Sequence, residues 1–359
     1  MAQYSWEALT AKYRGWQAPA VEVSIDGQPL LDQEWRLQSL QCSLSTGIEA
    51  SVCTLVLGNV YDRKNSRFTC ENILTLGASV RVSLGYIKAS LVFVGYLYEI
   101  EYELGETASV TLRCMDVKGA MMGSSFITEE TTFRKGIRSM FSGPHARGYS
   151  ILCSAPAMEN LPELDRLISF DTSGLDDFGF LRQTAELWGL ECFVRQGNLL
   201  LRKKPQSKTS VVEISPGDFH SLSASFSTTG YVHMVRVRGG TDDERDGEKK
   251  RVAAQAENAN PLAPAGSKAA RVLNRVAEFY VPSVRDSKGA KERAEGELRR
   301  RNQSGNVRLS LRGLPDLFPG DSIDLRGISP KINGKYYVTE VTHQFNETAF
   351  STWAVCRKG

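Results

Sequence analysis

The chain has 359 residues and a formal net charge of +3, from 44 Lys and Arg against 41 Asp and Glu. Its hydrophobic content of 41% excludes wholesale disorder, and its balanced charge gives no support to a protein built around phosphate neutralisation. No apolar run approaches the roughly 20 residues of a membrane helix, and the opening MAQYSW lacks the basic and apolar regions of a signal peptide. The length favours about two or three domains.

Residues 1–17 are predicted to form an N-terminal helical arm. Four apolar residues follow one another at spacings of three, four and three, which is the stripe of a helix: Trp6, Leu9, Tyr13 and Trp16. We expect this helix to dock on its own chain or across a subunit boundary. A membrane anchor is disfavoured, because the polar face carries only Lys12 and Arg14 as cations.

Residues 18–117 are predicted to form a first small antiparallel β-barrel. Apolar residues alternate with polar ones in six or more short segments, most of them separated by Gly, Asn or Asp. Val21, Val23 and Ile25, for example, precede a tight hairpin turn at Asp26 and Gly27.

Residues 118–207 are predicted to form an α+β linker domain. One helix, capped by Thr131 or Thr132, carries Phe133, Ile137, Met140 and Phe141. A second helix is expected from Asp176 to Trp188, with Gly189 at its C-terminal cap. A hairpin then turns through 196–198.

Residues 208–238 and 305–359 are predicted to form a second β-barrel, into which 239–304 is inserted. The part 239–270 contains little apolar sequence and is interpreted as a flexible excursion. The part 286–302 is predicted to be a charged helix with a thin apolar stripe of Ala290, Ala294 and Leu298. The predicted fold class is therefore α+β and mainly β, with two related barrels, an inserted α+β unit and a charged helical insertion.

An internal repeat supports the relation between the two barrels. The segment 76–114 matches 319–356 in the order of turn, strand, hairpin turn and strand. The offset is 243 at Gly77 and Gly320, and 241 at the two Glu-Thr-Ala turns. In this alignment Val94 corresponds to Val338.

No pattern of catalytic or ligand-binding residues is present, so we predict no catalytic, cofactor-binding or metal-binding residue and no cofactor. The sequence contains no GxSxG, Walker or GxGxxG motif. None of the four histidines has the spacing of a metal-ligand pair; they are His145, His220, His233 and His343. The densest carboxylates are Asp176–Asp177, at the start of a helix, and 242–244, in the predicted excursion.

The seven cysteines are interpreted as small buried hydrophobic residues. They lie too far apart for a CxxC motif, and their odd number fits synthesis in a reducing compartment. Several fall on alternating apolar faces. The set is Cys42, Cys53, Cys70, Cys114, Cys153, Cys192 and Cys356.

The C-terminal part resembles phage tail hub proteins. The segment GLPDLFPGDSIDL at 313–325 is similar to a strand-opening motif of that family, and GKYYVTEVTH at 334–343 to its second motif. Upstream, 175–191 and 197–202 resemble the linker helix and hairpin of the family. The family is the late-control D type of baseplate hub, which is shared by contractile phages, phage-tail-like bacteriocins and the hub part of type VI secretion spikes.

The resemblance implies a structural protein and not an enzyme. Two barrels in each of three chains would form a ring of six around one axis, joining a sixfold tail tube to a threefold spike. The implied partners are two further copies of this chain, the tail tube protein, a spike protein and baseplate wedge proteins. A tape-measure protein is a further candidate partner, and the sequence does not decide whether the lumen contacts that protein or DNA. Because the sequence stops soon after the last predicted strand, the spike is expected on a separate chain. The implied location is the baseplate of a virion or tail-like particle made in the host bacterial cytoplasm.

Two other functions stay open at this stage. A glycan-binding or hydrolytic tail protein would need clustered acids and exposed aromatic side chains, whereas the five tryptophans are scattered in sequence. A nucleic-acid-binding barrel protein would use Arg299–Arg301 and, more weakly, Arg202–Lys204. Acidic residues within 286–297 dilute the first of these basic patches, so we expect no specific nucleic acid and no membrane anchor.

Overall fold

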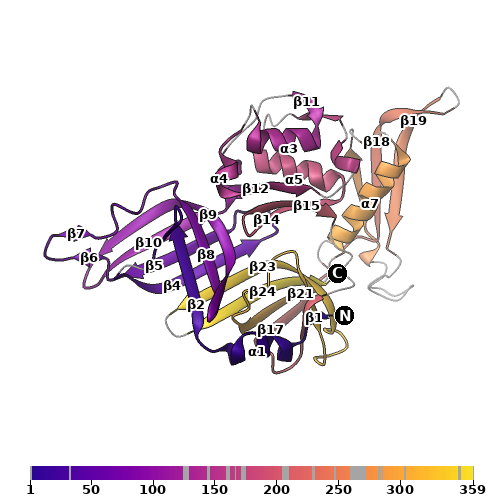
Figure 1. Cartoon of the computed structure of the whole chain (residues 1–359). Coiled ribbons are helices and arrows are strands. Elements are labelled where there is room, and N and C mark those ends of the chain that lie inside the picture. Colours follow the sequence, from indigo (N-terminus) through magenta and orange to yellow (C-terminus); the bar gives the residue numbers. More distant parts are fainter. Residues whose placement is uncertain are drawn as a thin grey trace.

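The computed structural model describes residues 2–358 except 32–33, 124–128, 144–145, 159–161, 166, 171–174, 204–209, 229–230, 246–247, 259–271, 282–283, 285, 303–304 and 347–348. The described residues form two β units, a linker unit and an insertion unit (Figure 1). Each of the last two has its own hydrophobic core, whereas one continuous core fills both β units. The mainly-β prediction is therefore confirmed.

The first β unit is an antiparallel sheet. Its main strands are β2 (Pro19–Ile25), β3 (Gln28–Pro29), β4 (Arg36–Ser45), β5 (Val52–Gly58), β8 (Ser79–Tyr86), β9 (Lys88–Leu104) and β10 (Ala108–Met115). A small hairpin of β6 (Tyr61–Asp62) and β7 (Arg67–Phe68) extends from its outer end (Figure 1).

The second β unit is assembled from strands on both sides of the insertion unit. They are β16 (Ser210–Ile214), β17 (Phe219–Phe226), β21 (Gly305–Arg312), β22 (Ser322–Leu325), β23 (Gly334–Asn346) and β24 (Phe350–Lys358).

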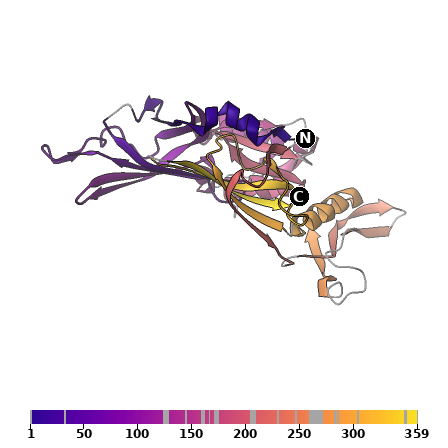
Figure 2. The same ribbon diagram turned by 90° about the horizontal axis from the view of Figure 1, so that it is seen from below.

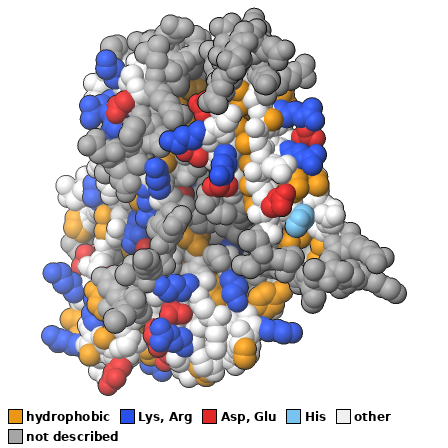
Figure 3. All heavy atoms as spheres, turned by 90° about the vertical axis from the view of Figure 1, so that its right-hand side faces the viewer, with side chains coloured by type: hydrophobic (Ala, Val, Ile, Leu, Met, Phe, Trp, Pro, Cys, Tyr) orange, Lys and Arg blue, Asp and Glu red, His pale blue; other side chains and the backbone are white. Residues whose placement is uncertain are grey.

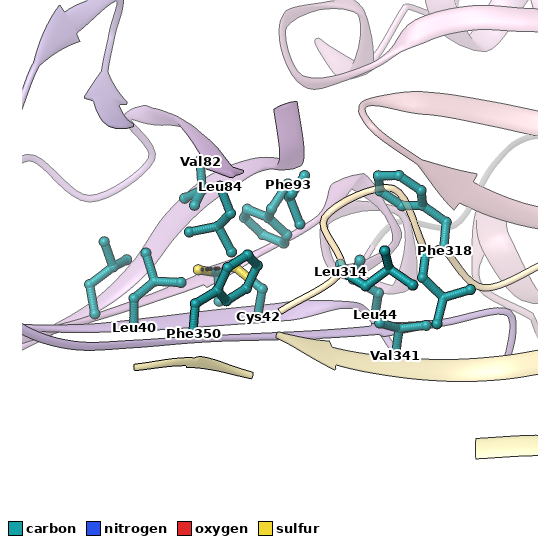
Figure 4. Close-up of a cluster of buried hydrophobic side chains, with 14 of the residues drawn as sticks. Leu40, Cys42, Leu44, Val82, Leu84, Phe93, Leu314, Phe318, Val341 and Phe350 are labelled. Carbon is teal, nitrogen blue, oxygen red and sulfur yellow. Dashed lines mark hydrogen bonds between the residues drawn. The ribbon is translucent and has the colours of Figure 1, made fainter. Parts of the chain in front are cut away.

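One sheet runs through both β units, a connection that the prediction of two related barrels did not include. The first part of β23 pairs with β22, whereas residues 340–346 pair on the same edge with Ser39–Ser45 of β4. We call this second pairing the seam. Figure 4 shows the core beneath it, where Phe350 and Val341 of the second unit lie near Leu40 and Leu44 of the first. The sequence pattern fixes which residues face inward, but not which strand becomes the partner of a strand edge.

The internal repeat appears as two β meanders with the same backbone hydrogen bonds. In the first meander (β8, β9, β10), the N–H of Gly77 donates to the carbonyl of Leu97 at 2.8 Å. In the second (β22, β23, β24), the N–H of Gly320 donates to the carbonyl of Val338, also at 2.8 Å. The φ angles of the two glycines are 88° and 90°. The structural equivalent of Val338 is thus Leu97 and not Val94, so the sequence alignment was wrong by three residues here.

The equivalence continues into the following strands. Leu97 pairs with Cys114, and Val338 pairs with Cys356. Directly beside each of these pairs, the register shifts by one residue. A bulge at the same place in both copies bends both strands in the same way.

The linker unit contains both predicted helices and the predicted hairpin. In α3 (Phe133–Ser142) the Thr132 hydroxyl caps the helix, and in α5 (Asp177–Leu187) the Asp176 carboxylate does so. The hairpin is β14 (Leu190–Arg195) and β15 (Asn198–Lys203). The remaining elements are α2 (Val117–Met122), β11 (Glu129–Thr132), α4 (Tyr149–Leu152), β12 (Ser154–Met158), η2 (Pro162–Asp165) and β13 (Leu167–Phe170).

The insertion unit corrects the predicted flexible excursion. Residues 239–257 belong largely to β18 (Met234–Arg245) and β19 (Glu248–Glu257), which pair with each other, and β20 (Val276–Val281) completes the sheet. The rest of the predicted excursion lies almost wholly outside the described residues. Burial alternates along β20 and along residues 252–257 of β19, so these strands turn one face inward. The average apolar content of the segment did not reveal this pattern.

The charged helix is present as α7 (Ser287–Arg301), and it covers one face of that sheet. Figure 2 shows this unit projecting to one side of the two β units. Ala290 and Ala294 of α7 are fully buried against Val235 and Val237 of β18 and Val252 of β19. The thin apolar stripe is therefore the face of α7 that packs on the sheet.

The N-terminal arm docks on its own chain. It consists of β1 (Ala2–Tyr4), α1 (Trp6–Lys12) and η1 (Arg14–Trp16), and β1 pairs with β16. Trp16 packs against Tyr86 of the first β unit, with ring centroids 5.5 Å apart. Tyr13 also packs against Tyr86, while its hydroxyl donates to Asp316 next to the second β unit. The Trp6/Trp16 face therefore packs within the chain.

Candidate assembly surfaces and the junction of the units

The turn of the β14–β15 hairpin joins three units. The Gln196 amide donates to the carbonyl of Leu91 in the first β unit at 2.7 Å. The Arg195 guanidinium donates to Asp321 in the second at 2.7 Å and lies 4.4 Å from the Phe318 ring centroid. Burial raises the pKa of Asp321, and the charge of Arg195 opposes that shift. Such a partly buried ion pair fixes the linker unit against the second β unit.

A second polar contact joins the same units. The Tyr337 hydroxyl donates to Glu191 at 2.6 Å, and Arg202 donates to the carbonyl of Gly320 at 2.7 Å. Arg202 also pairs with Glu191. Desolvation raises the pKa of Tyr337, so its hydroxyl keeps its proton and remains a donor.

The first β unit meets the linker unit at a buried lysine. Lys118 is fully buried, and its ammonium donates to the carbonyls of Ser45 at 3.0 Å and Glu49 at 2.6 Å. The Asp116 carboxylate lies 3.9 Å away and is also buried. Burial lowers the pKa of Lys118 and raises that of Asp116, while each charge partly offsets the shift of the other.

The outer face of the joined sheet carries uncharged polar side chains at the seam. The Gln344 amide donates to Gln41 at 3.0 Å, and the hydroxyls of Ser43 and Thr342 lie 3.4 Å apart. A groove of about 350 Å³ opens here, and its lining includes Ser39, Gln41, Thr54, Gln344 and Ser351. This face is broad and polar, and it extends over both β units.

Several large apolar side chains are exposed, and Trp353 lies on this same outer face, because it pairs with Thr342 of the seam strand. Trp353 of β24 is 47% exposed. Tyr102 and Leu104 lie at the outer end of β9, and Val276 and Tyr280 lie on β20. Exposed large apolar side chains of this kind are candidate contact points for other proteins.

The three described histidines lie apart from one another in the fold. His343 is fully buried, with its Nδ1 3.0 Å from the Thr352 hydroxyl, and desolvation lowers its pKa to about 4. His220 is exposed, His233 is half-buried, and His145 lies outside the described residues. Within the described part of the chain, no group of three or more His, Cys, Asp or Glu side chains is arranged to hold a metal ion.

The carboxylate pairs noted in the sequence have structural positions. Asp176 caps α5, and Asp177 accepts a hydrogen bond from the buried Tyr149 hydroxyl at 2.8 Å. Burial raises the pKa of Asp177. Residues 242–244 lie in β18, where their side chains are outside the described part of the structure.

Two of the basic residues noted in the sequence pair with acids. Arg301 pairs with Glu297, and Arg202 pairs with Glu191. The side chains of Arg299 and Arg300, and all of Lys204, lie outside the described residues. Figure 3 shows Lys and Arg interspersed with Asp and Glu on the described part of the face that it presents.

The tryptophans are dispersed over the fold. Trp6 and Trp16 stack on each other with centroids 5.1 Å apart, and Trp35 is buried in the first β unit. Trp188 packs against Phe133 in the linker unit. These four take part in intramolecular packing, which leaves Trp353 as the exposed member of the set.

Comparison with solved structures identifies the class of fold. The chain is similar to the 43 kDa tail protein of prophage MuSo2 from Shewanella oneidensis, at a TM-score of 0.70 and 13% identity over 94% of this chain and 98% of that one. It is also similar to the tail protein from Neisseria meningitidis MC58, at a TM-score of 0.68 and 12% identity over 95% and 97%. The chain therefore has the fold of phage tail proteins.

A third solved structure widens the range of this fold. The chain is similar to the E. coli c3393 protein at a TM-score of 0.51 and 10% identity, over 93% of this chain and 76% of that one. That protein is described as a component of the type VI secretion system with structural similarity to the T4 tail proteins gp27 and gp5. No curated protein matches the sequence. No helix among the described residues is long and apolar enough to span a bilayer.

One family model matches more than half of the chain. Residues 153–347 match the model described as the Alg8 N-terminal domain, and by that match the chain belongs to the family that the model defines. The matched range begins within the linker unit and ends beside the last residue of β23, so it coincides with none of the four units. The match therefore adds nothing to the assignment of a site.

Proposed function

We propose that the protein is the structural baseplate hub of a contractile tail or tail-like injection particle, of the late-control D type, and that it is not an enzyme. Support comes from the phage tail fold, which extends over nearly the whole chain. The observation that carries the proposal is the duplicated meander, in which Gly77 and Leu97 have the same hydrogen bond as Gly320 and Val338.

The duplication suits a symmetry adaptor. Two related β units in each of three chains make six related units around one axis. A sixfold tail tube can bind one face of such a ring, while the threefold arrangement of the chains matches a trimeric spike on the other face. A trimer of this kind has an obligate interface, on the order of 2,000 Å² or more. The seam suits this role, because it holds the two units of one chain in a fixed relation.

We further propose that the polar outer face of the seam lines the lumen of the ring. Its uncharged side chains, such as Gln41, Gln344 and Thr342, offer few strong attachment points to a tape-measure protein or DNA that moves past them. The exposed apolar residues on β9 and β20 are then available for the tail tube, the spike and the baseplate wedge proteins. On this proposal the protein is located in the baseplate of the particle.

The test is the mass of the purified chain by light scattering, alone and together with the tail tube and spike proteins encoded beside it. We expect three times 39.7 kDa, either for the chain alone or once the spike protein is added. A chain that stays monomeric at tens of micromolar and binds neither partner would overturn the hub proposal. The fold would remain, but the ring of six units would be excluded.

A further inference from the structure

Four buried side chains form a row across the centre of the joined sheet. His343 of β23 pairs with Cys42 of β4, Cys42 with Cys53 of β5, and Cys53 with Cys114 of β10. All four side chains are 0% exposed, and the three cysteines are free thiols. Cys42 and Cys53 are 11 residues apart on consecutive strands, and strand register brings Cys114 and His343 beside them.

Two of the thiols are in direct contact. The Sγ atoms of Cys42 and Cys53 lie 2.7 Å apart, and the yellow sulfur atoms are visible at the dashed line in Figure 4. Directly opposed residues of antiparallel strands have Cα atoms about 4.5–5.5 Å apart. A disulfide needs Cα atoms roughly 4.4–6.8 Å apart, so the backbone already has the separation that the bond requires.

We propose that Cys42 and Cys53 are a redox pair that closes to a cross-strand disulfide when the protein meets a peroxide. One thiol sulfur attacks hydrogen peroxide, which breaks the O–O bond and leaves a sulfenic acid and one water. The second thiol sulfur then attacks the sulfenic sulfur, an S–S bond forms, and the hydroxyl leaves as a second water after taking up a proton. In sum, two thiols lose two electrons and two protons to one peroxide.

The position of the pair gives the bond a mechanical consequence. Cys42 lies on β4, the strand that forms the seam with β23, and Cys53 lies on the neighbouring strand β5. The bond therefore ties the seam strand covalently to the rest of the first β unit. A bridge between residues close in sequence restrains the unfolded chain over a short loop only, so we expect a moderate gain in stability.

The burial of the two thiols makes formation of the Cys42–Cys53 disulfide slow. Burial raises the pKa of Cys53, and the reactive species in thiol oxidation is the thiolate. Reaction in the folded protein therefore requires a transient opening near β4 and β5. Cys114 flanks Cys53 on the other side and is a potential competitor, but the direct sulfur contact is with Cys42.

The experiment has two arms and uses the full chain. In the first, folded protein is incubated with hydrogen peroxide; in the second, unfolded protein is refolded in a buffer of oxidised and reduced glutathione, which removes the barrier of access. Free thiols are counted in denaturant, and peptides are mapped by mass without reduction. We expect a loss of two thiols per chain from the initial seven, a Cys42–Cys53 linkage, and a higher denaturation midpoint for the oxidised form.

Matched variants separate this pair from the other cysteines. Cys114→Ala should still lose two thiols, whereas Cys42→Ala and Cys53→Ala should not form the linkage. Both Cys42→Ala and Cys53→Ala are made, so that the test still works if one of these two variants folds poorly. The proposal is overturned if refolding in oxidised glutathione leaves seven thiols, or if the linkage maps to Cys53–Cys114 or between chains. None of these outcomes depends on whether the protein is a hub.

Discussion

Leu97 and Val338 occupy equivalent positions in two halves of one chain. Each carbonyl accepts the N–H of a glycine with a φ angle near 90°, at the same distance of 2.8 Å. The surroundings of the two glycines nevertheless differ. A Cβ atom at Gly77 would meet nothing within 4 Å, whereas one at Gly320 would lie 2.6 Å from the Phe193 ring.

This pair gives a first prediction. Gly77→Ala should cost about 1–2 kcal/mol of unfolding free energy, because only the left-handed backbone is penalised. Gly320→Ala should cost about 1–3 kcal/mol more, because the new methyl group also overlaps the linker unit. Urea denaturation of the two variants measures the difference. Equal losses would mean that the contact of Phe193 with the Gly320 turn is not formed in solution.

The buried pair of Lys118 and Asp116, where the first β unit meets the linker unit, gives a second prediction. Lys118→Met should cost about 3–5 kcal/mol, because it leaves the buried Asp116 carboxylate without its nearest opposite charge. Adding Asp116→Asn, which keeps the cap of α2, should recover most of this loss. A double-mutant cycle by chemical denaturation is the measurement. Additive losses in the double variant would argue against a coupled pair.

The buried histidine gives a third prediction, for the pH dependence of stability. The pKa of His343 is lowered from 6.5 to about 4 in the folded protein, so between these values the unfolded chain binds more protons. The contribution of His343 to the free energy of unfolding is therefore fully present above pH 6.5. It falls by roughly 3 kcal/mol as the pH drops towards 4. Comparing wild type with His343→Asn from pH 4 to 7 isolates the effect. Parallel curves for the two proteins would contradict it.

The N-terminal arm gives a fourth prediction. Replacing Trp6 and Trp16 together with Ser removes the stacked rings that pack on Tyr86 of the same chain. We expect the free energy of local unfolding of the arm to fall by about 1–3 kcal/mol, with the oligomeric mass unchanged. Hydrogen exchange of α1 amides, measured beside light scattering, tests both parts. A lower mass with unchanged exchange in α1 would instead place these rings at a subunit boundary.

Local elements were predictable because their signals are local. The caps at Thr132 and Asp176 and the stripe of Ala290 and Ala294 identified their helices correctly. The burial of the cysteines followed from alternation in the strands. The repeat was visible because a positive-φ glycine and a hairpin turn leave a recognisable spacing.

Features that depend on partners distant in sequence were not predictable. Nothing in residues 39–45 indicates that their neighbours will be 340–346, and the seam therefore appeared only in the structure. The same holds for the ion pair of Arg195 and Asp321. The insertion sheet was missed for a different reason, since small alanines on alternate positions give a weak hydrophobic signal.

The seam can form only late in the synthesis of the chain. Its two strands are separated by about 300 residues, which a ribosome adds at about 5–20 residues per second. Strand β4 therefore waits for roughly 15–60 s with one edge open after it has emerged. Unpaired strand edges are templates for wrong pairing, so the nascent chain passes through a period of vulnerability that ends only when its last strands arrive.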